Sequence, residues 1–312
     1  MIISASRRTD IPSYYSEWFF RRLKENYVLV RNPFNPHQVS KISLSPEVVD
    51  GIVFWTKNPA PMLSRLAELE NYHYYFQFTL TPYGQEIEKN LPSKKEIIIP
   101  SFQRLSEEIG KERVVWRYDP IFFNEIYTLD CHCRCFEVLA AELAQYTQHC
   151  TVSFLDLYRN TKRNVKQYGM RQVLPAEQME LLGRFAEIAK PYHICIDTCA
   201  EVGDFSQFGI MPAQCIDRER LERIGQFRLD IGKDKNQRSS CGCVESIDIG
   251  AYNTCKNGCA YCYANYNSAT VGDNFRSHHP LSPLLFGEIT EADCVREREA
   301  KSFADRQMSL FE

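Results

Sequence analysis

The sequence predicts an α/β fold in which parallel strands alternate with amphipathic helices. Two observations support this: six short runs rich in β-branched and aromatic residues, and apolar residues spaced three or four apart in the stretches between them. Strand followed by helix, repeated along the chain, is typical of a parallel sheet with helices outside it. A closed or partly closed (β/α)6-type, TIM-like barrel fits this pattern better than an open sheet. The expected strands are Ile2–Ser6, Ile52–Thr56, Tyr74–Thr81, Val114–Tyr118, Val152–Tyr158 and His193–Thr198.

The same patterns divide the chain into three parts. Residues 1–200 form the predicted barrel, and Val28–Val30 and Ile97–Ile99 are candidates for extra short strands. Residues 201–275 contain many glycines and cysteines, so we expect an irregular segment held by metal and packed on the barrel. Residues 276–312 form a charged tail with an expected helix over Glu291–Ala304. The other expected helices are Tyr14–Leu23, Pro61–Leu69, Phe102–Ile109, Phe136–Tyr146, Ala176–Ala189 and Asp217–Ile224.

Composition limits the classes of protein that fit. The chain has 312 residues, of which 44% are apolar and 25% charged, as in ordinary globular proteins. A net charge of −3 gives no general attraction to nucleic acids or membranes, and no apolar run reaches the length of a membrane span. The first ten residues do not resemble a signal peptide, so we expect a cytoplasmic protein. In that reducing compartment the 13 cysteines are expected to be metal ligands or buried thiols.

Three cysteines near the C-terminus have the spacing of a metal-binding loop. Cys255, Cys259 and Cys262 follow the pattern C-x3-C-x2-C. Three thiolates on one tight loop can hold three irons of a [4Fe-4S] cluster and leave the fourth iron open for another ligand. The alternative is a zinc knuckle, but zinc loops more often contain C-x2-C pairs and would need a fourth ligand nearby.

This spacing, with the aromatic Tyr261 directly before the third cysteine, resembles the signature of the radical S-adenosylmethionine superfamily. The resemblance implies a partial (β/α)6 barrel and a [4Fe-4S] cluster whose open iron chelates S-adenosylmethionine. It also implies reductive cleavage of that molecule to a 5′-deoxyadenosyl radical, with electrons from a flavodoxin- or ferredoxin-type donor.

One feature departs from the superfamily pattern. There the motif normally follows the first strand, whereas here it lies beyond all six predicted strands. Either the cysteine-rich loop folds back over the barrel mouth, or the barrel is circularly permuted with Val244–Gly250 as its first strand. Because six strands already precede the motif, we favour the fold-back. Both arrangements place the cysteines near the Ser6–Asp10 loop.

A longer resemblance covers nearly all of residues 1–266. The segments SASRRTDIP, VFWTKNP, WRYDP and SIDIGAYNTCKNGCAYCYAN are similar to a bacterial family known as domain of unknown function 1848. The WRYDP segment also resembles part of spore photoproduct lyase, a radical enzyme that repairs DNA.

Polar residues at the predicted strand ends are candidates for binding the cosubstrate, because ligand groups of βα barrels lie there. The Gly-Gly-Glu element of the superfamily is absent, so Arg117 is the candidate partner of a carboxylate; an internal ion pair with Asp119 is the alternative. Arg117 and Tyr118, the latter as a radical relay, are the candidate catalytic residues. The alternative for the whole set is that these residues start loops and cap helices. The cosubstrate-binding candidates are Ser6, Arg7, Arg8, Asp10, Lys57, Arg117, Asp119 and Tyr261.

Four further cysteines form a second candidate metal set. Cys199 ends the sixth predicted strand, and Cys215, Cys241 and Cys243 lie in the irregular segment. We expect an auxiliary [4Fe-4S] cluster on these four, with structural zinc or four buried thiols as alternatives.

The last residues, Gln307–Phe311, resemble the short peptide by which bacterial DNA polymerases and repair proteins bind the sliding clamp. The sequence therefore predicts a radical S-adenosylmethionine enzyme with an unidentified substrate, for which nucleic acid is the most specific hypothesis. The alternative is a zinc- or iron–sulfur-stabilised nucleic-acid-binding protein without radical catalysis, although the chain has no basic stripe.

Overall fold

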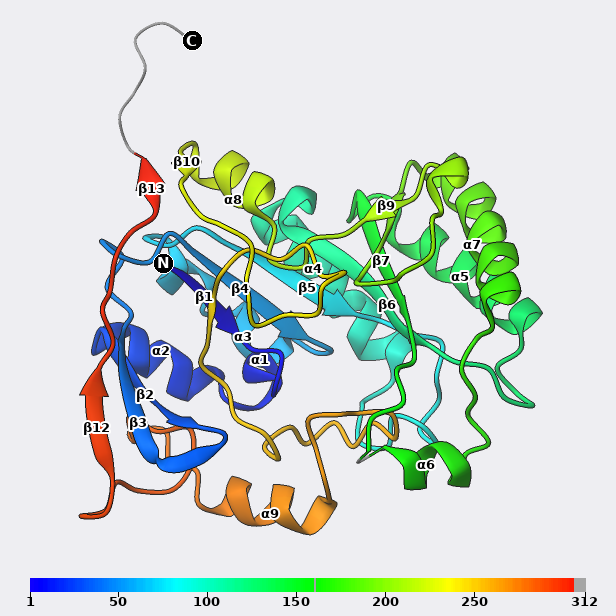
Figure 1. Cartoon of the computed structure of the whole chain (residues 1–312). Helices are drawn as coiled ribbons and strands as arrows, with labels where there is room; N and C mark the ends of the chain where they lie inside the picture. The colour runs from blue at the N-terminus through cyan, green and yellow to red at the C-terminus, as the bar shows by residue number, and fades with distance from the viewer. Residues whose placement is uncertain (160, 306–312) are drawn as a thin grey trace, which may run out of the picture.

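The computed structural model describes residues 1–159 and 161–305 and is built around one sheet of eight parallel strands (Figure 1). All six predicted strands belong to this sheet, with small shifts of their ends. Two further strands of two residues each, β9 and β11, form its edges. In spatial order the strands are β11 (Ile247–Asp248), β1 (Ile2–Ala5), β4 (Gly51–Thr56), β5 (Tyr74–Thr79), β6 (Val114–Ile121), β7 (His149–Phe154), β8 (Cys195–Thr198) and β9 (Met211–Pro212).

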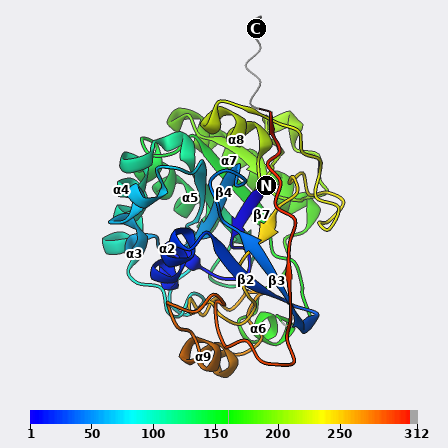
Figure 2. The ribbon, with the colours of Figure 1, turned by 90° about the vertical axis from the view of Figure 1, so that its left-hand side faces the viewer.

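Helices in the crossovers cover one face of this sheet, here called the helix-covered face. Figure 2 shows α3 and α4 on one side of the strands and the C-terminal chain, in red, on the other. On this face the ring of Phe136 stacks on Trp116 and Phe185, with centroid distances of 4.9 and 4.0 Å. Burial of each such ring contributes about 1.5–3 kcal/mol. The helices are α1 (Ile11–Tyr14), α2 (Ser16–Lys24), α3 (Ala60–Leu63), α4 (Ile99–Ile109), α5 (Leu129–Leu143) and α7 (Pro175–Ala189).

The opposite face of the sheet, here called the inner face, is covered by the cysteine-rich part of the chain. Side chains alternate along each strand, so Trp116 and Tyr118 of β6 lie in the helix-covered core while Val115 lies in a second core. In this second core α8 (Arg218–Gly225) and its neighbouring loops pack on the sheet. Its members include Ile2, Val53, Tyr75, Val115, Ile216, Leu221, Leu229 and Val244.

The sheet is open, and the predicted barrel closure is not observed among the described residues. Its two edge strands, β11 and β9, do not pair with each other. Residues 201–250 occupy the inner face that a closed barrel would enclose. The apolar surface of that face is therefore buried by the segment, and burial does not require the edges to meet.

The edge strand β11 decides between the two arrangements considered for the cysteine motif. It pairs in parallel with β1, with Ile3 opposite Ile247 and Ser4 opposite Asp248. The motif therefore follows directly from a strand that precedes β1 in the spatial order. The favoured fold-back was wrong, and the permuted placement of this strand is the one observed. Counting six strands as a complete barrel was misleading, because the sheet contains eight.

Smaller sheets complete the fold and correct two further predictions. Val28–Val30 belongs to β2 (Tyr27–Asn32), which pairs with β3 (Asn35–Ser43), whereas Ile97–Ile99 is helical. The predicted helix over Glu291–Ala304 is absent from the described residues. In this range, β12 (Cys294–Glu297) pairs with β3 and extends the small sheet of β2 and β3. The strand β13 (Ala304–Asp305) pairs with β10 (Arg228–Leu229). This segment has few apolar residues to bury as a helix, so edge pairing satisfies its backbone instead.

The remaining helices are α6 (Lys162–Gln167) and α9 (Ser268–Arg276), and no described helix is long and apolar enough to cross a membrane.

Tyr118 and His132 form a buried polar pair on the helix-covered face. The Tyr118 hydroxyl lies 2.9 Å from Nδ1 of His132, and Nε2 of the same ring lies 2.9 Å from the carbonyl oxygen of Phe122. A neutral imidazole satisfies both contacts, because Nε2–H donates to the carbonyl and Nδ1 accepts from the hydroxyl. Burial lowers the pKa of His132 from 6.5 to about 4, so the ring is neutral in the folded protein at pH 7.

This low pKa makes a pH-dependent contribution to stability. Between about pH 6.5 and pH 4 the unfolded chain binds a proton at His132 that the folded protein does not, so the free energy of unfolding falls as the pH falls. The loss approaches about 3 kcal/mol at pH 4. Urea unfolding across this range should show a shallower pH slope for His132→Gln than for the unsubstituted protein. The exposed His279→Gln should keep the original slope, and equal slopes for His132→Gln and the unsubstituted protein would contradict the assignment.

Candidate functional site

The three motif cysteines lie on the loop that follows β11, beside the loop that follows β1. Asn257 donates a hydrogen bond to the Asp10 carboxylate at 3.0 Å, and the Tyr263 hydroxyl donates to the carbonyl of Arg7 at 2.9 Å. The predicted proximity of the cysteine loop to Ser6–Asp10 is therefore observed. Both loops leave the carboxyl ends of parallel strands, which is where α/β sheets place their ligand sites.

Hydrogen bonds fix the backbone of this loop along its first turn. Four consecutive carbonyl groups, those of residues 254–257, each accept a hydrogen bond. The donors are the Tyr15 hydroxyl, the Asn265 side chain, and the side chain and backbone of Asn90. Gly258 follows with a φ of +67°, and a Cβ there would lie 2.9 Å from the Asn90 amide. These hydrogen bonds and the turn at Gly258 define the backbone path of the loop.

The thiols of Cys255, Cys259 and Cys262 are placed close enough to influence one another's ionisation. Burial raises the pKa of all three, to about 12 for Cys259, and charge on one thiol disfavours charge on the next. Among residues 1–159 and 161–305, no three His, Cys, Asp or Glu side chains are grouped as ligands of one metal ion.

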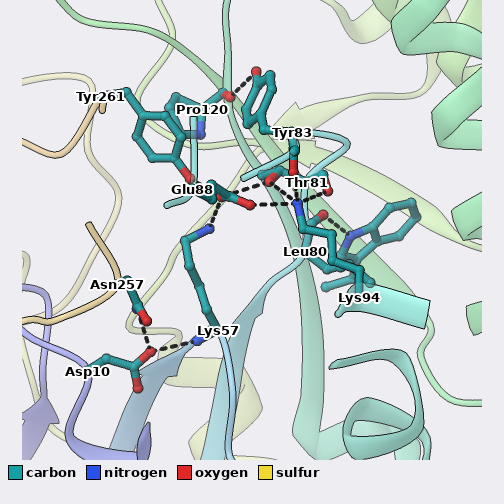
Figure 3. Close-up of polar contacts among 12 residues, drawn as sticks. Asp10, Lys57, Leu80, Thr81, Tyr83, Glu88, Lys94, Pro120, Asn257 and Tyr261 are labelled. Atoms are coloured by element: carbon teal, nitrogen blue, oxygen red, sulfur yellow. Dashed lines mark hydrogen bonds and ion pairs between the residues drawn. The ribbon is translucent and has the colours of Figure 1, made fainter. Parts of the chain in front are cut away.

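A buried carboxylate, Glu88, lies beside this loop and holds two lysines (Figure 3). Its two oxygens accept from Lys57 Nζ at 2.7 Å and Lys94 Nζ at 2.5 Å. Thr81 donates to it at 2.9 Å, and the hydroxyl of Tyr261 donates as well. Although burial opposes ionisation, the two ammonium groups lower the pKa of Glu88 to about 2. The group therefore carries one net positive charge.

That positive charge faces the cysteine loop. Glu88 and Cys259 are bridged through their backbones, and Ala260 N–H donates to the carbonyl of Ile87 at 2.8 Å. Burial raises the pKa of Cys259, whereas the Lys57 ammonium opposes that rise, so the lysine stabilises a thiolate at this position. Lys57 was among the predicted residues, but Glu88 and Lys94 were not. They lie in loop and helix-start positions where no sequence pattern marks them.

A second carboxylate missed by the sequence, Asp248, ties β11 to the loop after β1. It accepts hydrogen bonds from Ser4 at 2.9 Å, Ser6 at 2.6 Å, and the backbone N–H groups of Arg7 and Gly250 at 2.9 and 3.0 Å. Ser6 is therefore engaged within the protein. Asp10 is engaged in the same way, because its carboxylate accepts from Ser13, Thr56, Lys57 N–H and Asn257.

The side chains of Arg7 and Arg8 each lie over an aromatic ring. The Arg7 guanidinium lies over the Trp55 ring, 5.6 Å from its centre, and donates to Ser246 at 3.3 Å. Arg8 is half-buried and lies over the Tyr252 ring at 5.2 Å, three residues before Cys255. Within the described part of the chain, the Arg8 guanidinium donates no hydrogen bond and forms no ion pair. It remains available to a ligand.

Arg117, Asp119 and Tyr118 do not form one catalytic group. Arg117 is paired with Asp119 at 2.5 Å, which is the alternative considered for this residue, and Asp119 also accepts from Ser153. Tyr118 lies on the other face of the sheet against His132, away from the cysteine loop. Tyr261 is buried among Tyr83 and Phe122, where its hydroxyl bonds to Glu88.

The four cysteines of the second predicted set come together on the inner face. The Sγ atoms of Cys199 and Cys215 are 3.0 Å apart. The thiol of Cys243 interacts with those of Cys215 and Cys241. Arg117 connects this group to the polar residues of the β6 end, since its Nη1 lies 2.9 Å from Cys215 Sγ.

The ion pair of Glu88 is expected to be a major contribution to the stability of the site. Glu88→Gln leaves two ammonium groups with no carboxylate between them, and breaking a buried pair typically costs about 3–5 kcal/mol. Urea unfolding at pH 7 should show this loss. Glu86→Gln, on the same loop but exposed, should cost no more than about 1 kcal/mol. Similar losses for the two variants would mean that the lysines find other partners.

Comparison with known proteins identifies a family but no individual relative. Residues 2–264 match the family described as "Domain of unknown function (DUF1848)". Searches of curated proteins and of solved structures each returned no match.

Proposed function

The chain belongs to the DUF1848 family, and we propose that it is a radical S-adenosylmethionine enzyme of the superfamily that its cysteine motif resembles. One observation carries the proposal: Cys255, Cys259 and Cys262 share a braced loop that leaves an edge strand next to β1. In the superfamily the motif follows the first strand of a partial barrel. Here β11 precedes β1 in space, which supports the proposal because a permuted chain order would give the loop the corresponding position.

The donor set fits the implied cofactor. Cys255, Cys259 and Cys262 would hold a [4Fe-4S] cluster, which supplies an open iron for S-adenosylmethionine and the electron that cleaves it. The ammonium of Lys57 would offset thiolate charge at Cys259, and Glu88 would keep that lysine in place. Asp10 and Asp248 act as positioning residues, because their carboxylates are fully used in joining the two loops.

Arg8 is the best candidate for direct contact with the cosubstrate. Stacking on Tyr252 fixes its guanidinium beside the cysteine loop without using its N–H donors. A guanidinium binds a carboxylate through two parallel hydrogen bonds, and the methionyl end of S-adenosylmethionine carries a carboxylate. In this proposal Arg8 replaces Arg117, which is occupied by Asp119.

The remaining parts of the proposal concern partners and location. A flavodoxin- or ferredoxin-type donor would supply the electron, and the enzyme would work in the cytoplasm. The candidate clamp-binding peptide, Gln307–Phe311, lies outside the described residues. If that peptide binds the clamp, nucleic acid is the natural substrate class.

Anaerobic reconstitution tests the reaction. With iron, sulfide and a strong reductant, the protein should bind about four irons at this loop and convert S-adenosylmethionine to 5′-deoxyadenosine. Cys255→Ala, Cys259→Ala and Cys262→Ala should each abolish the product, whereas Cys195→Ser, at an exposed position, should not. A reconstituted protein that holds only zinc and forms no 5′-deoxyadenosine would contradict the proposal and favour the non-catalytic alternative.

A second variant tests the role of Arg8. Loss of a charge-assisted contact of about 1.5–3 kcal/mol should weaken the binding of S-adenosylmethionine ten- to a hundred-fold in Arg8→Ala. Equilibrium binding to the reconstituted protein measures this directly, with iron content as the check that the cluster is intact. Arg276→Ala, on the exposed face of α9, should bind normally. Unchanged affinity in Arg8→Ala would remove this residue from the site.

A further inference from the structure

Two pairs of tyrosine rings lie at the surface beside the motif cysteines. Tyr252 and Tyr266 flank the cysteines and are stacked, with ring centres 6.1 Å apart and ring planes 16° apart. Tyr263, the residue after Cys262, packs on Tyr158 of the loop after β7, with ring centres 5.2 Å apart. Tyr266 is 58% exposed, and Tyr158 and Tyr263 are each 39% exposed. Single exposed rings need no explanation, whereas a group of them marks a binding surface.

Hydrogen bonds of the backbone hold these tyrosines in place. The Tyr266 N–H donates to Oδ1 of Asn253 at 2.6 Å, and the Asn253 N–H donates to the carbonyl of Ala264 at 2.9 Å. The Tyr263 hydroxyl donates to the carbonyl of Arg7 at 2.9 Å. Rings held in this way lose little conformational freedom when a flat ligand stacks on them.

The basic helix α6 lies against the same loop, here called the motif loop (residues 249–266). The side chain of Asn164 in α6 donates to the carbonyl of Ala260 at 2.9 Å. Figures 1 and 2 both place α6 close to α9, the helix that follows the motif loop, at one end of the molecule. The exposed cations of α6 are Lys162, Arg163 and Lys166.

This end of the molecule is positively charged, although the chain as a whole is not. Residues 157–176 contain five Lys or Arg and no Asp or Glu, and residues 249–272 contain one Lys and no Asp or Glu. The three exposed cations of α6 form no ion pair with any residue that the structure describes. The acids that border these segments are already engaged within the protein; they are Asp156, Glu177, Asp248 and Asp273. The net charge of −3 therefore conceals a local surface that attracts polyanions.

We propose that this surface binds single-stranded nucleic acid, with phosphates on the cations of α6 and bases on the tyrosine rings. Positive charge that follows the backbone and aromatic rings that stack on the bases are the two elements by which proteins bind single strands. A duplex fits less well, because neighbouring base pairs cover the base faces. An acidic protein would match the charge of α6 but would leave the exposed rings without a role.

The position of this surface makes the bound strand a substrate. Arg8, the residue proposed to hold the cosubstrate, lies over Tyr252, and Tyr252 stacks on Tyr266. A base stacked on Tyr266 is therefore one ring away from the proposed cosubstrate site. The identification of the strand as the substrate rests on the proposed function, whereas its binding depends only on the rings and the cations.

Fluorescence anisotropy with a labelled strand of about 12 nucleotides tests the role of α6. The reconstituted full-length protein should bind DNA or RNA strands of this length more tightly than the corresponding duplex. Lys162→Ala combined with Lys166→Ala should weaken binding and reduce the slope of log affinity against log salt by about 1.4, since each phosphate contact contributes about 0.7. The control, Lys111→Ala combined with Lys190→Ala, removes the same charge near the amino ends of β6 and β8 and should bind normally.

The same assay tests stacking through Tyr266. Tyr266→Ala should weaken binding about five- to a hundred-fold and leave the salt slope unchanged, because a ring is lost and no charge is removed. Tyr266→Phe keeps the ring and should bind like the unsubstituted protein. The difference in affinity between the DNA and RNA strands shows which of the two the surface prefers.

Absence of binding to either strand at low salt would overturn the proposal. Equal binding of the duplex, with no effect of Tyr266→Ala, would do the same. Binding of an acidic flavodoxin-type donor that is lost in the Lys162 and Lys166 variant, with no strand bound, would assign the surface to that partner. Formation of 5′-deoxyadenosine is measured separately, so a protein that binds the strand but makes no product keeps this inference and loses the proposed function.

Discussion

The parallel pairing of β11 with β1 is the contact on which the candidate site depends. Two residues, Ile247 and Asp248, bring a late part of the chain to the first strand. So short a pairing is weak by itself, and Asp248 reinforces it by accepting hydrogen bonds from Ser4, Ser6 and the Arg7 N–H across the junction. Because the cysteine loop leaves β11 directly, its position relative to Asp10 and Arg7 follows from this junction. A register change of one residue would turn Asp248 away from Ser4 and Ser6 and would also move the cysteines.

Electrostatic balance is the second constraint on the site. Three cysteines can ionise only if positive charge or a metal compensates them, and burial makes ionisation harder. The Lys57–Glu88–Lys94 group supplies one positive charge at this point and stays buried because Glu88 satisfies both lysines. The single carboxylate thus has two effects: it makes burial of the lysines tolerable, and it leaves an excess charge directed at Cys259.

Sequence patterns predicted the parts of this protein that depend on local periodicity. The six long strands and most of the helices follow from spacing along the chain. The position of β11 beside β1 was only the less favoured alternative, because a two-residue strand carries too short a pattern to decide the strand order. Glu88 and Asp248 were missed because the partners that reveal their roles, Lys57 and Ser6, lie far from them in sequence. The error over Tyr118 was avoidable: alternation along β6 places Arg117 and Tyr118 on opposite faces, so both could not line one pocket.

The two cysteine sets lie on either side of a short polar path across the inner face. Arg117 contacts Cys215 and Asp119, and the charge of Asp119 is felt at Lys57, which lies beside Cys259. The sets differ in exposure, since Cys255, Cys259 and Cys262 are half-buried, whereas Cys215, Cys241 and Cys243 are buried. Because Arg117 contacts both Cys215 and Asp119, a change in the packing of Cys215 would move Asp119 and the charge that it presents to Lys57. The polar environment of the motif loop therefore depends on cysteines that lie in other segments of the chain.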